Sequence, residues 1–355
     1  MGVPAIHYGQ IYTYYGLSAT KTKSFVSSEL AKSLRKVDKG DVVITNTSEN
    51  LEDVGKALVY LGEQQAVTGG HATIFKPSEV ILGKYFAYFT QITEFSNEKR
   101  KYAKGTKVID VSATDMAKIQ IPIPSLHIQT EIVRILDEFA AVTAELTAEL
   151  TMRKKQYNYY RDQLLSFEKG EVEWKTLGEL AENLDSMRKP ITSGLREAGE
   201  IPYYGASGIV DYVKDYIFDG DYLLVSEDGA NLVARSTPIA FSISGKSWVN
   251  NHAHVLRFDT YAERRFVEFY LNSIDLTPYI SGAAQPKLNQ KNLNSISIPN
   301  PSLAEKERIV GVLDKFDALT SSITEGLPRE IELRQKQYEY YRDKLLSFPK
   351  AEVGA

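Results

Sequence analysis

Apolar and aromatic residues recur at spacings of three and four in two long stretches of this chain, 132–164 and 309–345. That spacing places them along one face of an α-helix and is typical of a coiled-coil seam. The two seams can therefore bury each other. The predicted spacer core consists of Ile132, Ile135, Phe139, Val142 and Leu146 in the first stretch and of Ile309, Val312, Phe316, Leu319 and Ile323 in the second.

The start of each helix is marked by a proline pair and a serine. One proline pair directly precedes Ser125 and another directly precedes Ser302. Because a serine side chain accepts hydrogen bonds from the free N–H groups of a first helical turn, we expect both serines to be N-caps. Gly326 and Pro328 lie inside the second seam, and they predict that this helix bends or restarts there.

Short apolar runs dominate the regions ahead of the two helices. They predict the strands Asp41–Thr45, Leu58–Leu61, His71–Phe75, Tyr222–Ser226, Pro238–Ile243 and His254–Phe258. Each region also holds an aromatic stretch of helical character, Lys84–Ile92 and Arg264–Ser273. The fold class that follows is mixed α/β (α+β), with two globular regions and two long helices.

The chain repeats itself. Lys155–Phe167 reads KQYNYYRDQLLSF and Lys336–Phe348 reads KQYEYYRDKLLSF. Ahead of these blocks, IPIPSL and IVRILDEF match IPNPSL and IVGVLDKF at an offset of 177 residues, whereas the blocks themselves lie 181 residues apart. The four extra residues amount to about one helical turn, so we expect the insertion to lengthen the second helix with little change of face. Such long-period similarity indicates two modules, each ending in a helix.

The repeat sets the expected boundaries. We expect a first variable region at 1–124, a first repeated helix at 125–170, a second variable region at 171–301, a second repeated helix at 302–349 and a tail at 350–355. The stretch 173–200 precedes the second variable region's Ile201-Pro-Tyr-Tyr run and has no counterpart ahead of Val3. We therefore expect the first variable region to be incomplete or to be completed by another segment.

Composition narrows the class of protein. The chain has 355 residues, 43% of them hydrophobic and 25% charged, which is enough for two cored domains. It has no cysteine, which excludes disulfides and thiolate zinc sites, and no apolar run approaches a transmembrane length, so we expect a cytoplasmic protein. The net charge of −4 argues against a simple polycationic binder of nucleic acid. Any affinity for DNA would have to come from localised loops and from partner subunits.

Motifs for catalysis are weak. Ala240 stands where the first glycine of a phosphate-binding loop ending in Gly245-Lys246-Ser247 belongs, and the alternating pattern there favours a strand. His252 and His254 lie on one predicted strand, but no third metal ligand is evident, so we favour a structural role and expect no metal site.

Polar and glycine-rich segments are the better candidates, as sites for binding DNA. Their side chains can contact phosphates and base edges, and glycine lets a backbone come close to its target. A hairpin turn with a half-buried tyrosine, or a solvated loop, explains the same residues without a function. The candidates are His7, Tyr8, Gln10, Tyr12, Thr45, Asn46, Thr47, Ser48, Lys104, Gly105, Thr106, Lys107, Tyr203, Tyr204, Gly205, Ser207, Gly208, Glu227, Asp228, Asn231, Ser281, Gly282, Gln285 and Lys287.

Together, the two variable regions, the IPxPSL-type helix entries, the IVxxLDxF helices and the KQYxYYRDxLLSF blocks resemble the specificity subunits of Type I restriction-modification systems. The resemblance covers nearly the whole chain. It implies that each variable region is a target recognition domain reading half of a bipartite double-stranded DNA site. It also implies that the repeated helices form an antiparallel coiled coil, related by a pseudo-two-fold repeat, that sets the half-site spacing and docks modification (methyltransferase) subunits.

The resemblance further implies that this chain has no catalytic activity of its own. Methyl transfer from S-adenosylmethionine to adenine would occur in the modification subunit, with the base flipped out of the duplex. Cleavage that depends on ATP and Mg would require the restriction (nuclease and translocase) subunit. A two-domain scaffold for protein interactions, with no affinity for DNA, is the alternative that the sequence leaves open.

Overall fold

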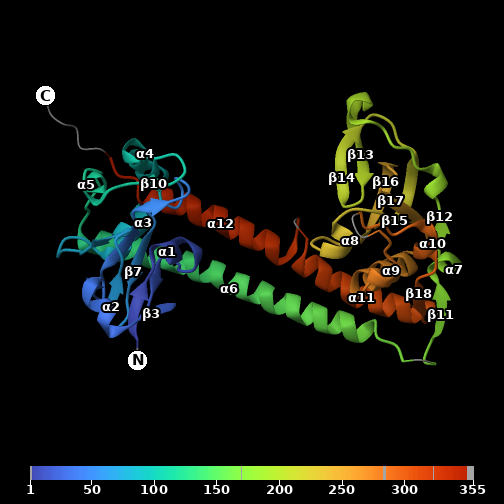
Figure 1. The fold of residues 1–355 in the computed structure, drawn as a ribbon, viewed down its shortest axis with the longest axis horizontal. Coiled ribbons are helices and arrows are strands. Elements are labelled where there is room, and N and C mark those ends of the chain that lie inside the picture. The colour runs from blue at the N-terminus through green and yellow to red at the C-terminus, as the bar shows by residue number, and fades with distance from the viewer. Residues whose placement is uncertain (1, 169, 283–284, 323, 350–355) are drawn as a thin grey trace. The chain divides into compact units, whose positions relative to one another are not determined.

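The computed structural model describes residues 2–168, 170–282, 285–322 and 324–349, and the chain divides into two compact units (Figure 1). Unit 1 comprises Met1–Thr147 and Glu330–Ala355, and unit 2 comprises Ala148–Arg329. Of the features predicted above, Ile323 and the tail at 350–355 lie outside the described residues.

Unit 1 contains two four-stranded sheets and one two-stranded pair. The first sheet has the order β3 (Ser24–Val26), β1 (Val3–Ile6), β8 (Ala66–Thr68), β4 (Arg35–Val37). The second has the order β2 (Ser18–Ala19), β7 (Ala57–Tyr60), β5 (Val42–Thr45), β9 (Ala72–Phe75), and β6 (Thr47–Ser48) pairs with β10 (Ile109–Asp110). The short helices are α1 (Tyr8–Thr13), α2 (Ser28–Ser33), α3 (Gly83–Phe89), α4 (Thr93–Tyr102) and α5 (Ala113–Met116).

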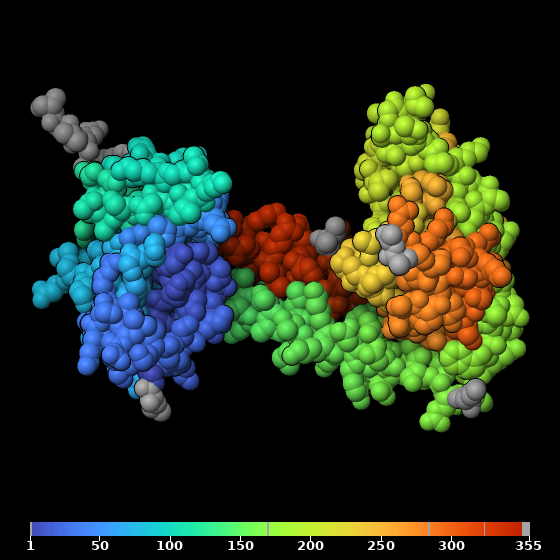
Figure 2. Space-filling view, viewed as in Figure 1, coloured from blue at the N-terminus to red at the C-terminus, as the bar shows by residue number. Residues whose placement is uncertain are grey.

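Unit 2 is built on a six-stranded sheet and a two-stranded pair. The sheet has the order β12 (Glu182–Asn183), β17 (Ala253–Arg257), β15 (Phe218–Ser226), β16 (Ala240–Val249), β13 (Ala198–Gly205), β14 (Gly208–Val213), and β11 (Glu173–Thr176) pairs with β18 (Ser297–Asn300). The shorter helices are α7 (Leu177–Leu180), α8 (Asn231–Ala234), α9 (Tyr261–Ser273) and α10 (Gln290–Asn294), with 3-10 turns η1 (Asp185–Met187), η2 (Ser193–Leu195) and η3 (Thr277–Tyr279). The β13–β14 hairpin stands out from the body of this unit (Figures 1 and 2).

The predicted mixed α/β class is confirmed, and every predicted strand and short helix overlaps an observed one. The first repeated helix, α6, is continuous from Leu126 to Leu164, and the second consists of α11 (Leu303–Thr320) and α12 (Gly326–Leu345). Ser302 caps α11 as predicted, since its side chain accepts a hydrogen bond from the N–H of Glu305. The restart at Gly326, where φ is 74°, is also confirmed.

One expectation about the insertion is wrong. The four extra residues of the second copy do not lengthen a continuous helix, because α11 stops at Thr320 and α12 begins only at Gly326. A residue with a side chain at position 326 would collide with the carbonyl oxygens of Ala318 and Leu319, and its positive φ would be strained. The glycine therefore allows a tight reversal of the backbone that a helix extension would not need.

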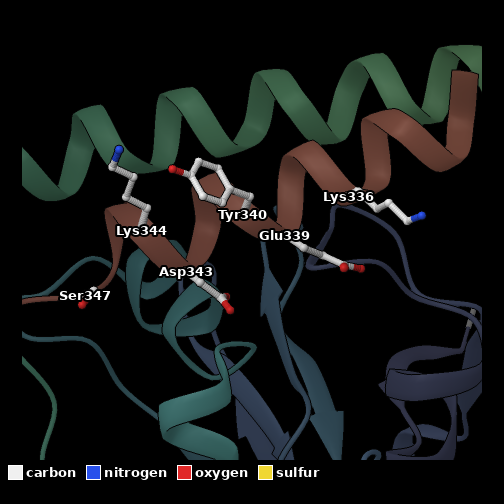
Figure 3. Close-up of a pocket in the computed structure, with 6 residues that line it drawn as sticks. All are labelled: Lys336, Glu339, Tyr340, Asp343, Lys344 and Ser347. Carbon is white, nitrogen blue, oxygen red and sulfur yellow. The ribbon is translucent and has the colours of Figure 1, made fainter.

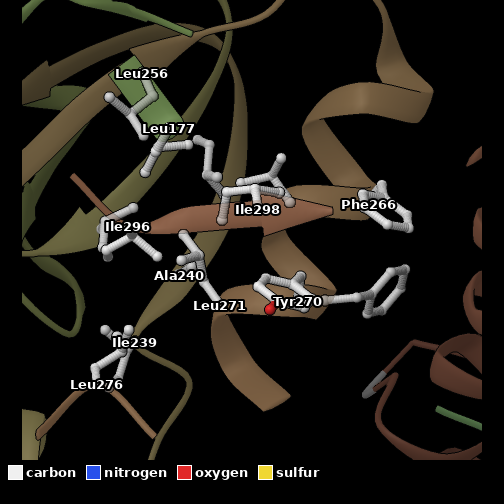
Figure 4. Packing of buried hydrophobic residues seen from close by; sticks show 14 of the residues in the cluster. Leu177, Ile239, Ala240, Leu256, Phe266, Tyr270, Leu271, Leu276, Ile296 and Ile298 are labelled. Atoms are coloured by element: carbon white, nitrogen blue, oxygen red, sulfur yellow. The ribbon is translucent and has the colours of Figure 1, made fainter. Parts of the chain in front are cut away.

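The repeated helices complete the hydrophobic cores in an exchanged order. In unit 1, Ile132 and Leu136 of α6 pack with Leu346, which follows the second repeated block. In unit 2, Ile309 and Leu313 of α11 belong to the core that includes Leu165, which follows the first repeated block. Figure 4 shows side chains of this second core, including Leu177, Phe266 and Ile298. Each copy of the repeated block thus packs on the other copy's IVxxLDxF helix.

Aromatic contacts within each unit show the same pairing. In unit 1 the ring of Phe139 stacks on Tyr341 at 5.4 Å, and in unit 2 the ring of Phe316 lies 5.8 Å from Tyr160. The early part of α6 therefore meets the late part of α12, and its late part meets α11, which is the order of antiparallel helices.

The spacer positions predicted from the sequence differ in burial. Ile132 and Ile309 are fully buried, and Val142 is 42% exposed. The half-buried positions are Ile135, Phe139, Leu146, Val312, Phe316 and Leu319. Leu136 and Leu313, which the seam pattern omits, have no exposed surface at all. The helices bury a wider stripe than a strict seam because they also cover the α/β cores.

Candidate nucleic-acid interface

Segments that are distant in the sequence meet at one surface of unit 1. His7 caps α1, and its ring lies 4.6 Å from that of Tyr8. Tyr8 in turn lies 5.1 Å from the ring of His71, whose Nδ1 is 3.4 Å from the hydroxyl of Thr47. The predicted loop after Val3–Ile6 is therefore a short helix, and it presents two aromatic rings beside β6.

A third segment joins this surface through β10. Thr47 is paired with Asp110 in the β6–β10 ladder, and Asp110 exchanges backbone hydrogen bonds of 2.8 and 2.9 Å with Lys104. The exposed residues Lys104–Lys107 are thereby held next to Thr47. Because three segments from different parts of the sequence are tied together by hydrogen bonds, the surface is built by the fold and is not a single flexible loop.

Unit 2 brings the matching segments together. The carbonyl of Ala206 accepts a hydrogen bond from Ser226, at the end of β15. Asp228, two residues further on, lies 2.9 Å from the ring of His252 and forms an isolated bridge with Lys287. Lys287 exchanges two backbone hydrogen bonds of 2.8 Å with Ser281. His252 occupies the position that His71 has in unit 1, so the two units repeat the arrangement with different residues.

The matched glycines in these segments serve the turns themselves. Gly105 has a φ of 102° and Gly282 a φ of 81°. A Cβ atom at either site would collide with a carbonyl oxygen three residues later, that of Val108 or of Gln285. The sequence predicts a close backbone approach at both positions, and the structure finds that approach inside the turn.

A buried charged cluster stands behind the surface of unit 2. The side chain of Asp185 lies 2.6 Å from Nδ1 of His254, and Arg188 donates to Glu227 at 2.6 Å. Lys287 also lies 3.0 Å from Glu227. Burial acts to raise the pKa of Asp185 and of Glu227, but hydrogen bonds to His254 and to Arg188 and Lys287 hold both below their ordinary values. The cluster fixes the end of β15 and the segment around Lys287.

Asp185, Glu227 and His254 place potential ligand atoms within 4.8 Å of one another. Their charges are already matched by the neighbouring Arg188 and Lys287, and Nε2 of His254 faces the carbonyl of Leu288 at 2.7 Å. A divalent cation would have to displace these partners. The group is therefore a structural ion-pair cluster, and the buried side chain of His254 has the structural role that the sequence favours.

The predicted contact residues fall into two groups. The exposed or half-exposed ones on the two surfaces are His7, Tyr8, Gln10, Tyr12, Asn46, Thr47, Lys104, Gly105, Thr106, Lys107, Tyr204, Ser207, Gly208, Asp228, Asn231, Ser281, Gly282, Gln285 and Lys287. The buried ones are Thr45, Ser48, Tyr203, Gly205 and Glu227. Tyr203 is 1% exposed, and its hydroxyl accepts a hydrogen bond from the N–H of Ile191, so it packs inside the unit. The buried group supports the surfaces from behind.

Three residues at these surfaces escaped prediction from the sequence. His71 and His252 were assigned only structural roles, although they lie at matched positions and face the candidate loops. Arg188 lies within the stretch that has no counterpart in the first repeat. The matched histidines alone carried a signal, because they recur in register where the sequence around them differs.

The phosphate-loop candidate is a strand. Gly245-Lys246-Ser247 lies within β16, where Gly245 is paired with Gly220 of β15. Its backbone groups are therefore engaged in a sheet ladder, and the sequence-based preference for a strand at this place is confirmed.

The repeated blocks expose matched aromatic residues. Tyr159 is 62% exposed and Tyr340, 181 residues later, is 61% exposed. Figure 3 shows Tyr340 beside Lys336, Asp343 and other polar side chains that line a shallow hollow of about 680 Å³. An exposed tyrosine among charged residues is typical of protein interfaces.

Comparison with known proteins gives the family. Residues 8–153 and 169–333 match the Type I restriction modification DNA specificity domain, so the matches cover more than half of the chain and both repeats. This chain belongs to that family, as its resemblance indicates.

Two relatives from Escherichia coli illustrate the similarity. The chain is 44% identical over 272 residues to the specificity subunit of Type I restriction enzyme EcoR124I/EcoR124II, which covers 68% of this chain and 66% of that protein. It is 40% identical over 243 residues to the EcoprrI specificity subunit, covering 62% and 59%. The alignments thus span less than two thirds of the length of either relative.

A solved structure, the S subunit of a Type I restriction-modification system from M. genitalium, shares the fold. It aligns with a TM-score of 0.59 over 98% of this chain and 89% of that chain, at 16% identity. In the part of the present chain that the structure describes, no helix is long and apolar enough to cross a membrane.

Proposed function

We propose that this chain is the DNA sequence-specificity subunit of a Type I restriction-modification complex. Residues 1–124 and 171–301 are the two target recognition domains, each of which reads one half of a bipartite double-stranded DNA target. The helices at 125–170 and 302–349 set the spacing between the half-sites, and 350–355 form a tail.

The observation that carries the proposal is the repeated convergence of three segments in both units. In unit 1 the surface combines Tyr8, Thr47 and Lys104–Lys107, and in unit 2 it combines Ser207, Asp228 and Lys287. Hydroxyl, amide and imidazole groups can read base edges, and the lysines can contact phosphates. Two similar but non-identical surfaces are what an asymmetric, split target requires.

The chemistry resides in partner subunits. A modification subunit supplies S-adenosylmethionine and methylates adenine, and a restriction subunit supplies cleavage that depends on ATP and Mg. The specificity subunit holds these enzymes at a chosen sequence in the cytoplasm. Its matched, exposed Tyr159 and Tyr340 suit the docking of two copies of the same modification subunit, because each lies in a nearly identical block.

The experiment is to purify the chain with its modification subunits and to methylate random-sequence DNA, with methylated adenines located by single-molecule sequencing. We expect one motif of two short halves separated by a fixed gap. A complex with His71→Ala and His252→Ala serves as the matched control, and its motif should be altered or lost. Complete absence of sequence-dependent methylation and binding by the assembled complex would instead favour an interaction scaffold that does not recognise DNA.

A further inference from the structure

One continuous stretch of unit 2, residues 173–191, completes three parts of that unit. Its first strand, β11, pairs antiparallel with β18, so that Lys175 lies opposite Ile298. The next residue of α7, Leu177, is fully buried, and its N–H donates a 2.8 Å hydrogen bond to the carbonyl of Ile296. This part of the stretch therefore closes the edge of β18 and covers the core beneath it.

The same stretch then reaches two further places. Its second strand, β12, pairs with β17, so that Asn183 lies opposite Leu256. Beyond η1, the carbonyl of Lys189 accepts a 2.6 Å hydrogen bond from the ring N–H of Trp248, and the N–H of Ile191 donates to Tyr203. These contacts cover the face of β13 and β16.

In unit 1 the three matching places are open. Residues 119–124 match 296–301, yet among the residues that the structure describes no strand is paired with them. The second place, β9, matches β17 and is the edge strand of its sheet. At the third place, Ala5 and Val67 occupy the register positions of Tyr203 and Trp248.

This third place is hollow. Ala5, Val67, Val26 and Leu34 contribute to the lining of a pocket of about 410 Å³ that extends to His71. In unit 2 the larger rings of the matching strand positions and the backbone of residues 189–191 occupy the corresponding face. A pocket with an apolar floor between paired strands is suited to an apolar side chain of an incoming segment.

The exposure of apolar side chains follows the same pattern. Four side chains of unit 2 under the completing stretch are at most 1% exposed, and they are Leu256, Leu293, Ile296 and Ile298. Their counterparts in unit 1 are Phe75, Met116, Ile119 and Ile121, of which only Ile119 reaches the buried class, at 9%. Ile123, on the same open edge, is 52% exposed. Unit 1 thus keeps the core positions of its counterpart without their cover.

We infer that these three places in unit 1 form one docking surface for a polypeptide segment supplied by another chain. The segment adds a strand to residues 119–124, places an apolar helical turn over Met116 and Ile119, and adds a second short strand to β9. Its chemistry is that of residues 173–191, an amphipathic strand–turn–strand. Unpaired strand edges call for backbone donors and acceptors, which a peptide supplies and a nucleic acid does not.

The inference goes beyond the proposed function and is tested separately from it. A synthetic peptide with the sequence of residues 171–198 is the probe, because unit 2 already binds this sequence in the required form. Fluorescence anisotropy of the labelled peptide is measured against the full chain, and hydrogen exchange of the chain is compared with and without peptide. Neither measurement uses DNA, so failure here leaves the recognition of DNA untouched.

We expect saturable binding of one peptide per chain, with slower exchange at residues 119–123 and 72–75 and no change at 296–300. A peptide with Leu177→Asp should bind at least about tenfold more weakly, since a charge would enter the apolar site. A chain with Ile123→Lys should also lose affinity, and it should fold normally because Ile123 is exposed.

Three outcomes would overturn the inference. They are absence of saturable binding, equal binding of the Leu177→Asp peptide, and protection confined to other parts of the chain. Self-association of the chain through residues 119–124, detected by sedimentation and abolished by Ile123→Lys, would identify a second copy as the occupant and would equally reject the proposed partner.

Discussion

The ammonium of Lys84 lies 2.7 Å from a carboxylate oxygen of Asp137, the aspartate of the first IVxxLDxF helix. The matched pair in unit 2, Arg265 and Asp314, is separated by 2.8 Å. In each unit this ion pair joins the last long helix of the variable region to the repeated helix. The repeated aspartate therefore anchors a variable region on its helix, which explains why it recurs in both copies.

The two anchors should differ in strength. Arg265 is only 12% exposed in its side chain and also contacts Glu268, whereas Lys84 is 28% exposed. Asp314→Ala leaves a buried guanidinium short of a partner, so we expect a loss of about 3 kcal/mol in the free energy of unfolding. Asp137→Ala should cost about 1 kcal/mol. Urea denaturation of the chain measures both.

A matched control for this comparison is Asp162→Ala. Asp162 pairs with Arg161 but is 60% exposed, so its loss should change stability by less than about 0.5 kcal/mol. Equal costs at Asp314 and Asp162 would show that the buried pair does not anchor the helix.

Lys99 should make the stability of unit 1 depend on pH in the alkaline range. Its ammonium is buried and donates a 2.6 Å hydrogen bond to the carbonyl of Val54, and burial lowers the pKa of Lys99 to about 8. The unfolded chain keeps a pKa near about 10.4. Between these values the unfolded state binds more protons, so the free energy of unfolding should rise with pH, by up to about 1.4 kcal/mol per unit.

The control is Lys99→Met, which has no titrating group at this site. The difference in unfolding free energy between the two proteins, measured from pH 7 to 10.5, isolates Lys99 from the tyrosines. A constant difference over that range would show that Lys99 remains charged in the folded state.

His71 and His252 should each govern one half of the recognised DNA sequence. They lie at matched positions, beside Tyr8 in unit 1 and Asp228 in unit 2. His71→Ala should weaken discrimination in one half of the methylated motif by about tenfold and leave the other half unchanged, and His252→Ala should do the converse. Sequencing of methylated random DNA gives both halves in one experiment, and parallel changes in both halves would contradict separate reading.

Lys107 should contribute to affinity without contributing to sequence preference. It is exposed on the segment held beside Thr47 by β10. Loss of one phosphate contact in Lys107→Ala should weaken binding to all sequences similarly and reduce the slope of log K against log salt by about 0.9. Lys39→Ala removes an exposed lysine that pairs with Glu63, and we expect it to leave the slope unchanged.

Tyr159 and Tyr340 should contribute to assembly with the modification subunits. Each is more than 60% exposed, so its replacement by alanine should leave the unfolding midpoint nearly unchanged. If they are interface residues, each single variant should weaken the binding of one modification subunit by at least about fivefold, and the double variant should weaken both. Native mass spectrometry counts the bound subunits. Full occupancy in the double variant would exclude these tyrosines from the docking face.

The local elements of the fold were predictable because they depend on short-range patterns. Strand β5 reads as a run of β-branched residues, and the break before α12 follows from Gly326. The effect of the insertion was not predictable in the same way. Its length suits one more helical turn, but the backbone reversal at Gly326 uses the extra residues for a different purpose.

Parts of the candidate interface could be predicted, but its support could not. The polar segments around Thr47 and Lys104 stand out in the sequence, whereas the burial of Tyr203 and the ion pairs of Arg188 depend on residues far away in the chain. Tyr203 looks like a surface aromatic in its local sequence. Only the contacts of residues 189–196 turn it into a core residue.

The sequence by itself determined the duplication, the mixed α/β class, the helix starts and the family, because these follow from local periodicity and from matched motifs. The tertiary structure decided which copy packs with which. The two KQYxYYRDxLLSF blocks are nearly identical and could fit either core, so their sequence cannot assign them. The turns and long-range contacts do so, and they place Leu346 in the core of unit 1 and Leu165 in that of unit 2.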